Sequence, residues 1–197
     1  MSDAGVESGE LLVLGAADVH AALDHHELEI IDAVANAYLT HRDGRADLPH
    51  ASFLRFGDDR ADRIIALLGR VDDDAPIAGM KWIASFPDNV QRGMARASAL
   101  LVLNSTETGR PKVVVESSII SARRTAASAA LAVRELHPAG EETTLGLIGC
   151  GLINFEIVRF VRSVAPRLNT LLLHDLDRAR AETFARRVSE ELPSPLT

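Results

Sequence analysis

The sequence predicts an α/β protein built in two parts. Short apolar runs separated by Gly, Asp and Pro fill most of the first part, together with an amphipathic helix. The second part runs from Thr143 to Asp175 in the order strand, glycine turn, helix, strand, acid. A parallel Rossmann-type sheet begins in this order. We therefore expect an N-terminal α+β domain followed by the first half of a Rossmann-type domain.

Short apolar runs predict the strands of the first part. Four runs are bounded by residues that favour turns, and they lie at Leu11–Leu14, Phe53–Phe56, Arg63–Leu68 and Gly79–Ser85. Two more runs, at Ala99–Asn104 and Lys112–Glu116, flank a loop that contains Gly109 and Pro111. This arrangement predicts a β-hairpin with a longer loop.

Three helices are expected among these strands. Asp18 is a suitable cap for a short helix over Val19–Leu23. From Leu28 onward, apolar residues recur at helical spacing as far as a stop at Gly44. The segment Ser117–Leu136 is rich in Ala, Ser and Arg and predicts one long helix. We place the domain boundary within residues 120–140, with this helix as the connection.

Composition excludes several classes of protein. The net charge is −7 and no basic stripe is visible, so nucleic acid is not an expected partner. The single cysteine, Cys150, leaves no intrachain disulfide, which favours a cytoplasmic protein. The N-terminus lacks the features of a signal peptide, and no apolar run approaches the length of a membrane span. The sequence suggests no metal site.

The glycine turn predicts a dinucleotide site. Gly149 and Gly151 occupy the first two glycine positions of such a turn, which allow a tight bend and a close approach of the pyrophosphate. The third position is Asn154 instead of Gly or Ala. The phosphates would lie on the free amides at the helix start, around Leu152 and Ile153. An ordinary βα turn is the alternative, and Cys150 is interpreted as a small residue in a tight space.

The acid at the end of the second strand selects the cofactor. A carboxylate at Asp175 can accept hydrogen bonds from both ribose hydroxyls and repels a 2′-phosphate. This favours NAD over NADP, although Arg178 lies close enough in sequence to weaken the inference.

Basic residues upstream suggest a place for an anionic substrate. Strand alternation puts Lys81 on the same face as Ile83 and opposite Trp82, so that Lys81 either snorkels at a strand edge or anchors an anion. Arg123 and Arg124 are about 100° apart around a helix, so one can face a pocket while the other faces solvent. An arginine fork suits a carboxylate, and a solvated helix face is the alternative.

These motifs together resemble the ornithine cyclodeaminase/μ-crystallin family. The resemblance covers the chain from the first strand to about residue 190. The motifs that carry it are Ala61–Ala66, Gly79–Ile83, Arg96–Ser98, Leu103–Asn104 with Glu107–Thr108, Ser118–Ser121, Arg124–Ala127 and Ile148–Ile153. The Lys81-Trp82-Ile83 version is similar to the branch of the family that makes 2,3-diaminopropionate.

The resemblance implies an NAD-dependent enzyme. It would oxidise the secondary amine of N-(2-amino-2-carboxyethyl)-L-glutamate to an imine, and water would release 2,3-diaminopropionate and 2-oxoglutarate for siderophore or antibiotic synthesis. Lys81 matches the family's active-site lysine, which would bind a carboxylate and polarise the reacting centre. Arg124 matches the carboxylate-binding arginine, whereas Arg123 does not. Family members usually dimerise through the N-terminal domain.

The same resemblance divides the chain and sets limits. It implies a substrate-binding and dimerisation domain at 1–120, a connecting helix at 121–140 and a partial Rossmann NAD-binding domain at 141–197. A family substrate anchor near Ala51 is absent or replaced by Arg55. The family's catalytic aspartate would lie beyond Thr197, so we expect a truncated or split product that binds NAD poorly and turns over little. The alternatives are an ornithine cyclodeaminase-like enzyme and a non-catalytic μ-crystallin-like nucleotide-binding or dimerisation fragment.

Overall fold

A computed structural model describes residues 10–58, 60–137 and 143–192, which divide into two compact units. The first unit draws on Met1–Ala22 and Asn36–Ser121, and the second on Leu23–Ala35 and Ala122–Thr197. The division falls inside α2 (Glu27–Arg42) and α3 (Ser118–Leu136), and it also separates the last residue of α1 (Ala16–Leu23) from the rest of that helix. Residues 23–35 belong to the second unit in this division.

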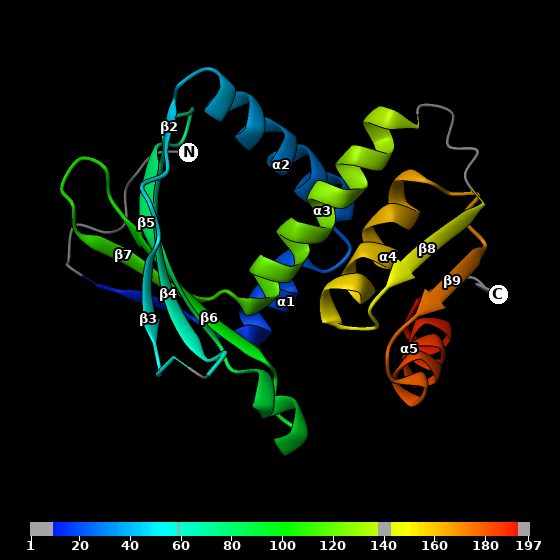
Figure 1. The fold of residues 1–197 in the computed structure, drawn as a ribbon. Helices are drawn as coiled ribbons and strands as arrows, with labels where there is room; N and C mark the ends of the chain where they lie inside the picture. Colours follow the sequence, from blue (N-terminus) through cyan, green and yellow to red (C-terminus); the bar gives the residue numbers. More distant parts are fainter. Residues whose placement is uncertain (1–9, 59, 138–142, 193–197) are drawn as a thin grey trace. The chain divides into compact units, whose positions relative to one another are not determined.

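The first unit is built on a seven-stranded sheet (Figure 1). The strand order is β1-β7-β6-β5-β4-β2, and β3 also pairs with β4. Only the β1–β7 pair is parallel within this sheet, and the other pairs are antiparallel. The strands are β1 (Leu12–Leu14), β2 (Ala46–Asp47), β3 (Ser52–Arg55), β4 (Arg63–Val71), β5 (Ile77–Ser85), β6 (Ala97–Asn104) and β7 (Pro111–Glu116).

The register gives the two faces of this sheet different characters. Lys81 pairs with Leu67 and Leu101, and this face includes the buried Ala99 and Val115. The opposite face is more exposed, and we call it the Trp82 face. Its exposed apolar residues are Val13, Leu54, Leu68, Trp82 and Leu100, each between 41% and 69% exposed.

Two helical segments complete the first unit. Helix α1 (Ala16–Leu23) begins before Asp18, so the prediction of Asp18 as the cap is wrong. Its carboxylate instead reaches back to accept a hydrogen bond of 2.8 Å from the Gly15 amide, as an acid in the first turn of a capping box does. A short 3₁₀ helix, η1 (Pro87–Arg92), links β5 to β6 and ends at Gly93, whose φ is +70°.

The second unit contains a parallel pair of strands covered on one face by helices. Strands β8 (Thr144–Ile148) and β9 (Thr170–His174) are joined by α4 (Leu152–Val164), and α5 (Arg178–Glu191) follows β9 (Figure 1). Alternation points one set of strand residues inward and leaves Ile148 85% and Leu172 61% exposed on the other face. The inward residues that pack against the helices are Leu145, Leu147, Leu171 and Leu173.

Two hydrophobic clusters hold the second unit together. One joins Phe160 of α4 to the alanines of α3 and to Ile31 of α2, which is fully buried. The other joins Phe155 of α4 to Phe184 and Val188 of α5. The small alanines of α3 let the helices approach closely, and the aromatic residues fill the space between α4 and α5. The predicted α/β fold class, with a Rossmann-type half at the C-terminal side, is confirmed.

Candidate functional site

The glycine turn between β8 and α4 has the backbone geometry that its sequence predicts. Gly149 has a φ of +90°, a conformation that favours glycine. Its amide donates 2.7 Å to the carbonyl of His174, which ties the turn to the end of β9. A Cβ atom at Gly151 would meet nothing within 4 Å, so the backbone there is open to close approach. The tight bend at Gly149 is therefore followed by an accessible backbone at Gly151, which is the order found in pyrophosphate-binding turns.

Asn154 replaces the third glycine and has a structural task that sequence reasoning missed. Its Nδ2 donates 3.0 Å to the carbonyl of Ile148 and 2.6 Å to that of Gly149. Both acceptors belong to the end of β8 and the start of the turn. The Asn154 side chain therefore stabilises the turn by hydrogen bonds. In other dinucleotide sites, the glycine at this position instead allows close packing of the helix on the strand.

The start of α4 offers backbone donors to an anion. Gly151 is the N-cap and forms no side-chain cap, and the first backbone bond back to it comes from the amide of Phe155, at 3.1 Å. The amides of Leu152, Ile153 and Asn154 precede that bond at the positive end of the helix dipole. Leu152 and Ile153 are also about half exposed. This end of the helix fits a phosphate group.

Asp175 lies directly after β9 and holds the same turn. One carboxylate oxygen accepts 2.7 Å from the amide of Cys150, and the other accepts 3.0 Å from the amide of Asp177. Hydrogen bonds from these two amides, Asp177 first, lower the pKa of Asp175 below its usual value of 3.8. Burial raises the pKa of the neighbouring Cys150 thiol, with a smaller effect from the Asp175 charge. An ionised acceptor thus stands beside the glycine turn, whereas Cys150 is a buried thiol.

Together these residues fit the adenosine side of NAD. The turn gives backbone access, the first amides of α4 suit the pyrophosphate, and an ionised Asp175 suits ribose hydroxyls. Arg178, which sequence reasoning flagged as a possible partner for a 2′-phosphate, is exposed and pairs with Glu182 at 3.0 Å.

Lys81 lies in the middle of β5 in the first unit and is half-buried. Its Nζ donates 3.2 Å to the Oγ of Ser121, a residue of the first turn of α3. Trp82 points to the opposite face of the sheet, as the alternation predicts. Arg55 of β3 shares the face of Lys81, two strands away.

The two adjacent arginines of α3 are separated by their burial. Arg123 is 2% exposed and pairs with Asp24, and its Nε lies 3.8 Å from a carboxylate oxygen of Glu156. Arg124 is exposed and belongs, like Arg123, to the second unit. Asp24 and the buried Glu156 therefore engage Arg123, which leaves Arg124 as the arginine that a carboxylate from solvent can reach.

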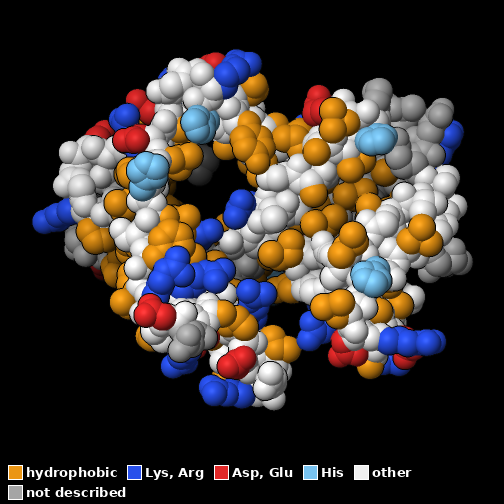
Figure 2. All heavy atoms as spheres, viewed as in Figure 1, with side chains coloured by type: hydrophobic (Ala, Val, Ile, Leu, Met, Phe, Trp, Pro, Cys, Tyr) orange, Lys and Arg blue, Asp and Glu red, His pale blue; other side chains and the backbone are white. Residues whose placement is uncertain are grey.

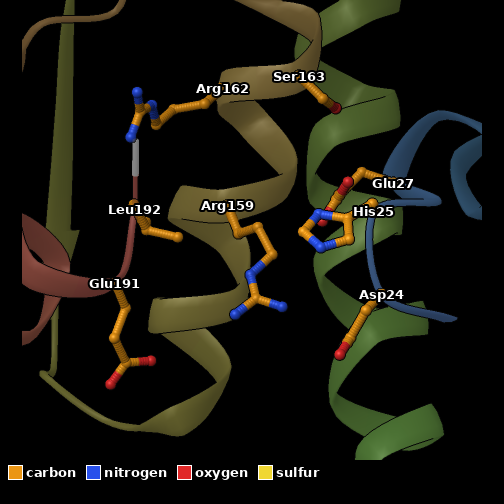
Figure 3. Close-up of a pocket in the computed structure, with 8 residues that line it drawn as sticks. All are labelled: Asp24, His25, Glu27, Arg159, Arg162, Ser163, Glu191 and Leu192. Carbon is orange, nitrogen blue, oxygen red and sulfur yellow. The ribbon is translucent and has the colours of Figure 1, made fainter. Parts of the chain in front are cut away.

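A groove of about 390 Å³ in the second unit carries neither the turn nor the basic residues discussed above (Figure 3). Figure 3 shows the Arg159 guanidinium pointing between Glu191 and Asp24, while Arg162 extends away from them. Glu191 is already engaged by Arg187 at 2.8 Å, and Asp24 by Arg123. Because Glu191 and Asp24 are already paired with arginines from outside its lining, this groove is a weaker candidate than the glycine turn.

The described ranges, 10–58, 60–137 and 143–192, hold neither a metal-binding cluster nor a helix that could cross a membrane. They contain no group of three or more His, Cys, Asp or Glu side chains placed to hold a metal ion. No helix in the same ranges is both long and apolar enough to cross a membrane.

The fold and the turn define a class. A parallel β8–α4–β9 unit with a glycine turn and a terminal acid is the beginning of a Rossmann-type dinucleotide-binding protein, here accompanied by a separate, mostly antiparallel sheet. Residues 10–194 match the family model described as the ornithine cyclodeaminase/mu-crystallin family. The chain belongs to this family, which confirms the resemblance read from its motifs.

Relatives and solved structures agree with this assignment. N-((2S)-2-amino-2-carboxyethyl)-L-glutamate dehydrogenase of Staphylococcus aureus is 32% identical over 188 residues, which cover 93% of this chain and 56% of the relative. An archaeal alanine dehydrogenase dimer with bound NAD superposes with a TM-score of 0.80 at 25% identity, covering 94% of this chain and 55% of that one. Delta(1)-pyrroline-2-carboxylate reductase of Thermococcus litoralis, in complex with NADH and L-proline, has the same fold, with a TM-score of 0.82 at 24% identity over 93% and 55% of the two chains. The chain thus spans little more than half the length of these proteins.

Proposed function

We propose that this chain belongs to an NAD-dependent amino-acid dehydrogenase, and that it binds the amino-acid substrate and the pyrophosphate and ribose of NAD. The observation that carries the proposal is the glycine turn, with its accessible backbone at Gly151 and the ionised Asp175 beside it. The match to the Staphylococcus aureus dehydrogenase over 93% of this chain supports the same class. The proposed reaction is oxidative cleavage of N-(2-amino-2-carboxyethyl)-L-glutamate to 2,3-diaminopropionate and 2-oxoglutarate, in a pathway to a siderophore or antibiotic.

Each site residue takes a role that its surroundings support. Lys81 binds a substrate carboxylate and polarises the reacting centre, because it presents an ammonium on an apolar sheet face. Arg124 binds a second carboxylate, because it is the exposed member of the arginine pair. Gly149, Gly151, Leu152 and Ile153 receive the pyrophosphate, and Asp175 receives the ribose. When bound, NAD supplies the acceptor for the hydride that leaves the substrate carbon.

Ornithine cyclodeaminase activity is the second candidate. Ornithine cyclodeaminase of Agrobacterium tumefaciens is 29% identical over 68% of this chain, so the same scaffold occurs with that activity. Both reactions begin by oxidising an amine at a carbon next to a carboxylate, and both need a cation at Lys81. The substrate separates them, because ornithine carries one carboxylate and the dehydrogenase substrate carries three. A third reading is a non-catalytic fragment that binds the nucleotide or dimerises without turnover.

Replacing Lys81 tests the enzyme proposal. Lys81→Ala should lower NADH formation from the amino-acid substrate by roughly a hundredfold, because the substrate carboxylate beside the reacting carbon loses its counter-charge. The nucleotide residues lie in the other unit, so NAD binding measured by fluorescence should not change. Absorbance of NADH with the purified chain and each candidate substrate gives the rate.

The second lysine of the chain provides a matched control. Lys112 is exposed at the start of β7, so Lys112→Ala should leave the rate unchanged. Unchanged turnover in Lys81→Ala would remove the role proposed for Lys81. A starting protein that binds NAD but forms no NADH with any candidate would favour the non-catalytic fragment.

We also propose that the chain forms a homodimer through the Trp82 face. Five large apolar side chains are exposed on this one face of the sheet, and an exposed apolar patch is typical of a protein–protein interface. Figure 2 shows that hydrophobic side chains reach the surface of both units. The alanine dehydrogenase neighbour is a dimer, which supports a second copy as the partner.

A further inference from the structure

Lysine is rare in this chain, and its two lysines have different surroundings. Of the 21 Lys and Arg residues, only Lys81 and Lys112 are lysines, and all the others are arginines. Lys112 is exposed, whereas Lys81 lies half-buried between Leu67 and Leu101 of the neighbouring strands. An ammonium is a compact charge on a flexible stem with four carbons, so its direction is undefined unless another group fixes it.

A hydroxyl group supplies that direction. The ammonium of Lys81 donates 3.2 Å to the Oγ of Ser121, 40 residues away in the sequence. An ammonium has three N–H bonds, so directing one of them restricts the other two to a narrow set of directions. The apolar neighbours on the sheet cannot do this, because they offer no acceptor from their side chains.

The segment that carries Ser121 is held rigidly to the same sheet. β7 passes into α3 without a loop, and the amide of Ser117 donates 2.9 Å to the carbonyl of Ala99 in β6. The carboxylate of Glu116 accepts a hydrogen bond of 2.7 Å from the amide of Ser118 and a second one from the Ser118 hydroxyl. The amide of Ser121 then donates 2.8 Å to the carbonyl of Ser117. The first turn of α3 is thus anchored to the sheet, and the backbone that carries the Ser121 hydroxyl is held in place.

We propose that Ser121 is the positioning residue of Lys81. Its hydroxyl accepts one N–H of the ammonium and so aims the remaining N–H bonds at the carboxylate of an amino-acid ligand. Ser121 acts through Lys81 and does not itself contact the reacting atoms. This inference rests on the proposed function for its ligand, whereas the placement of Lys81 by Ser121 is a property of the protein alone.

Nuclear magnetic resonance tests the placement without any ligand. Labelling lysine with ¹³C and ¹⁵N gives two side-chain signals, and exposed Lys112 serves as the internal reference. In the starting protein the Cε and Nζ shifts of Lys81 should differ from those of Lys112, and its ammonium protons should exchange more slowly with water. Ser121→Ala should move the Lys81 signals toward those of Lys112. Ser121→Thr keeps a hydroxyl and should preserve them.

A serine elsewhere in α3 separates this effect from a general change in the helix. Ser128 donates 3.0 Å to the carbonyl of Arg124, so Ser128→Ala also removes a serine hydroxyl from α3. It should leave the Lys81 signals in place. The proposal is overturned if Ser121→Ala leaves them in place as well, or if Ser121→Thr moves them as far as Ser121→Ala does.

Ligand kinetics then test the consequence. Ser121→Ala should raise the KM for the amino-acid substrate by roughly fivefold to tenfold, because Lys81 must be ordered anew at each binding event. Ser121→Thr should restore the starting KM. If the Lys81 signals respond as expected but no variant turns over any candidate, the placement stands and the proposed enzyme function fails. If KM is unchanged in an active Ser121→Ala protein, the positioning role fails and the enzyme function stands.

Discussion

Asp175 has two tasks at the scale of a single residue. Its two oxygens accept the amides of Cys150 and Asp177, and a carboxylate has about four acceptor positions in all. The remaining positions suit the ribose hydroxyls that the proposed NAD would bring. The same side chain therefore shapes the glycine turn without any ligand, and in the proposed function it would also bind the ribose.

Removing this carboxylate should weaken NAD binding. Asp175→Ala deletes two hydrogen bonds to ribose and a clamp on the turn, and we expect the Kd for NAD to rise by at least roughly tenfold. The preference for NAD over NADP should also fall, because no charge remains to repel the 2′-phosphate. Nucleotide quenching of protein fluorescence measures both. Asp177→Ala is the matched control, since it removes the side-chain cap of α5 and leaves the ribose contacts. Equal affinity for NAD and NADP in the starting protein would contradict the cofactor assignment.

The pH dependence of this site follows from the direction of its pKa. Because the folded protein lowers the pKa of Asp175, the stabilising effect of its charge is fully present above 3.8 and is lost as the pH falls below that value. NAD affinity in the same titration should therefore be independent of this residue from neutral pH down to mildly acidic conditions. A loss of affinity near neutral pH that disappears in Asp175→Ala would contradict this direction.

Sequence reasoning identified the candidate residues better than their local partners. The motif placed Gly149, Gly151 and Asp175 because backbone conformation and strand order leave few other choices there. The motif did not predict the hydrogen bonds of Asn154 to the turn, because it describes a glycine or alanine at the third position and not an amide side chain. The pairing of the buried Arg123 with Asp24 involves the turn between α1 and α2, about 100 residues away, and the local sequence pattern cannot show such a partner.

At the scale of the element, β5 is constrained by the strand beside it. A Cβ atom at Gly79 would lie 2.3 Å from the carbonyl oxygen of Val102, which is shorter than any real contact. The glycine therefore allows β5 and β6 to approach closely two residues before Lys81. Gly146 of β8 is different, because a Cβ atom there would meet nothing within 4 Å.

This contrast predicts opposite effects of the same substitution. Gly79→Ala should destabilise the protein by about 1–3 kcal/mol, because β5 and β6 must move apart. Gly146→Ala should be neutral or stabilise it by up to about 1 kcal/mol, because it only restricts the unfolded chain. Chemical denaturation followed by circular dichroism gives both free energies of unfolding. A neutral Gly79→Ala would show that the two strands do not need this close approach.

The strands and helices that the sequence predicts are those with long or regular apolar patterns. Strands β4 and β5 were predicted short at one end, because Gly69 and Arg70 interrupt the apolar run of β4 and Gly79 interrupts that of β5. The two-residue strand β2 and the helix η1 were missed, since each depends on pairing or turn geometry more than on periodicity. The parallel pairing of β1 with β7 brings together segments about 100 residues apart, a choice that local pattern does not encode.

At the scale of the whole molecule, the apolar pattern of α2 serves two units. Ile31 near its start is fully buried in the second unit, whereas Tyr38 and Leu39 near its end are 56% and 46% exposed in the first. The helical spacing of apolar residues predicts the helix, and it does not show that its two halves belong to different units. The exposed half of the stripe and the Trp82 face both leave apolar surface on the first unit. Burying such surface against a second copy would stabilise the chain.

A charge placed on the Trp82 face should separate the proposed dimer. Leu100 pairs with Trp82 across β6 and β5 and is 48% exposed, so Leu100→Lys keeps the core intact while placing an ammonium in the interface. A buried unpaired charge costs several kcal/mol, and the dimer Kd should rise by at least roughly a hundredfold. Analytical ultracentrifugation over a range of concentrations measures it. Leu172→Lys on the exposed face of β9 is the control, and it should leave the association unchanged because Leu172 lies in the other unit. The proposed dimer would be contradicted by a starting protein that stays monomeric at every concentration. A Leu100→Lys protein that dimerises with the starting Kd would show that the Trp82 face is not the interface.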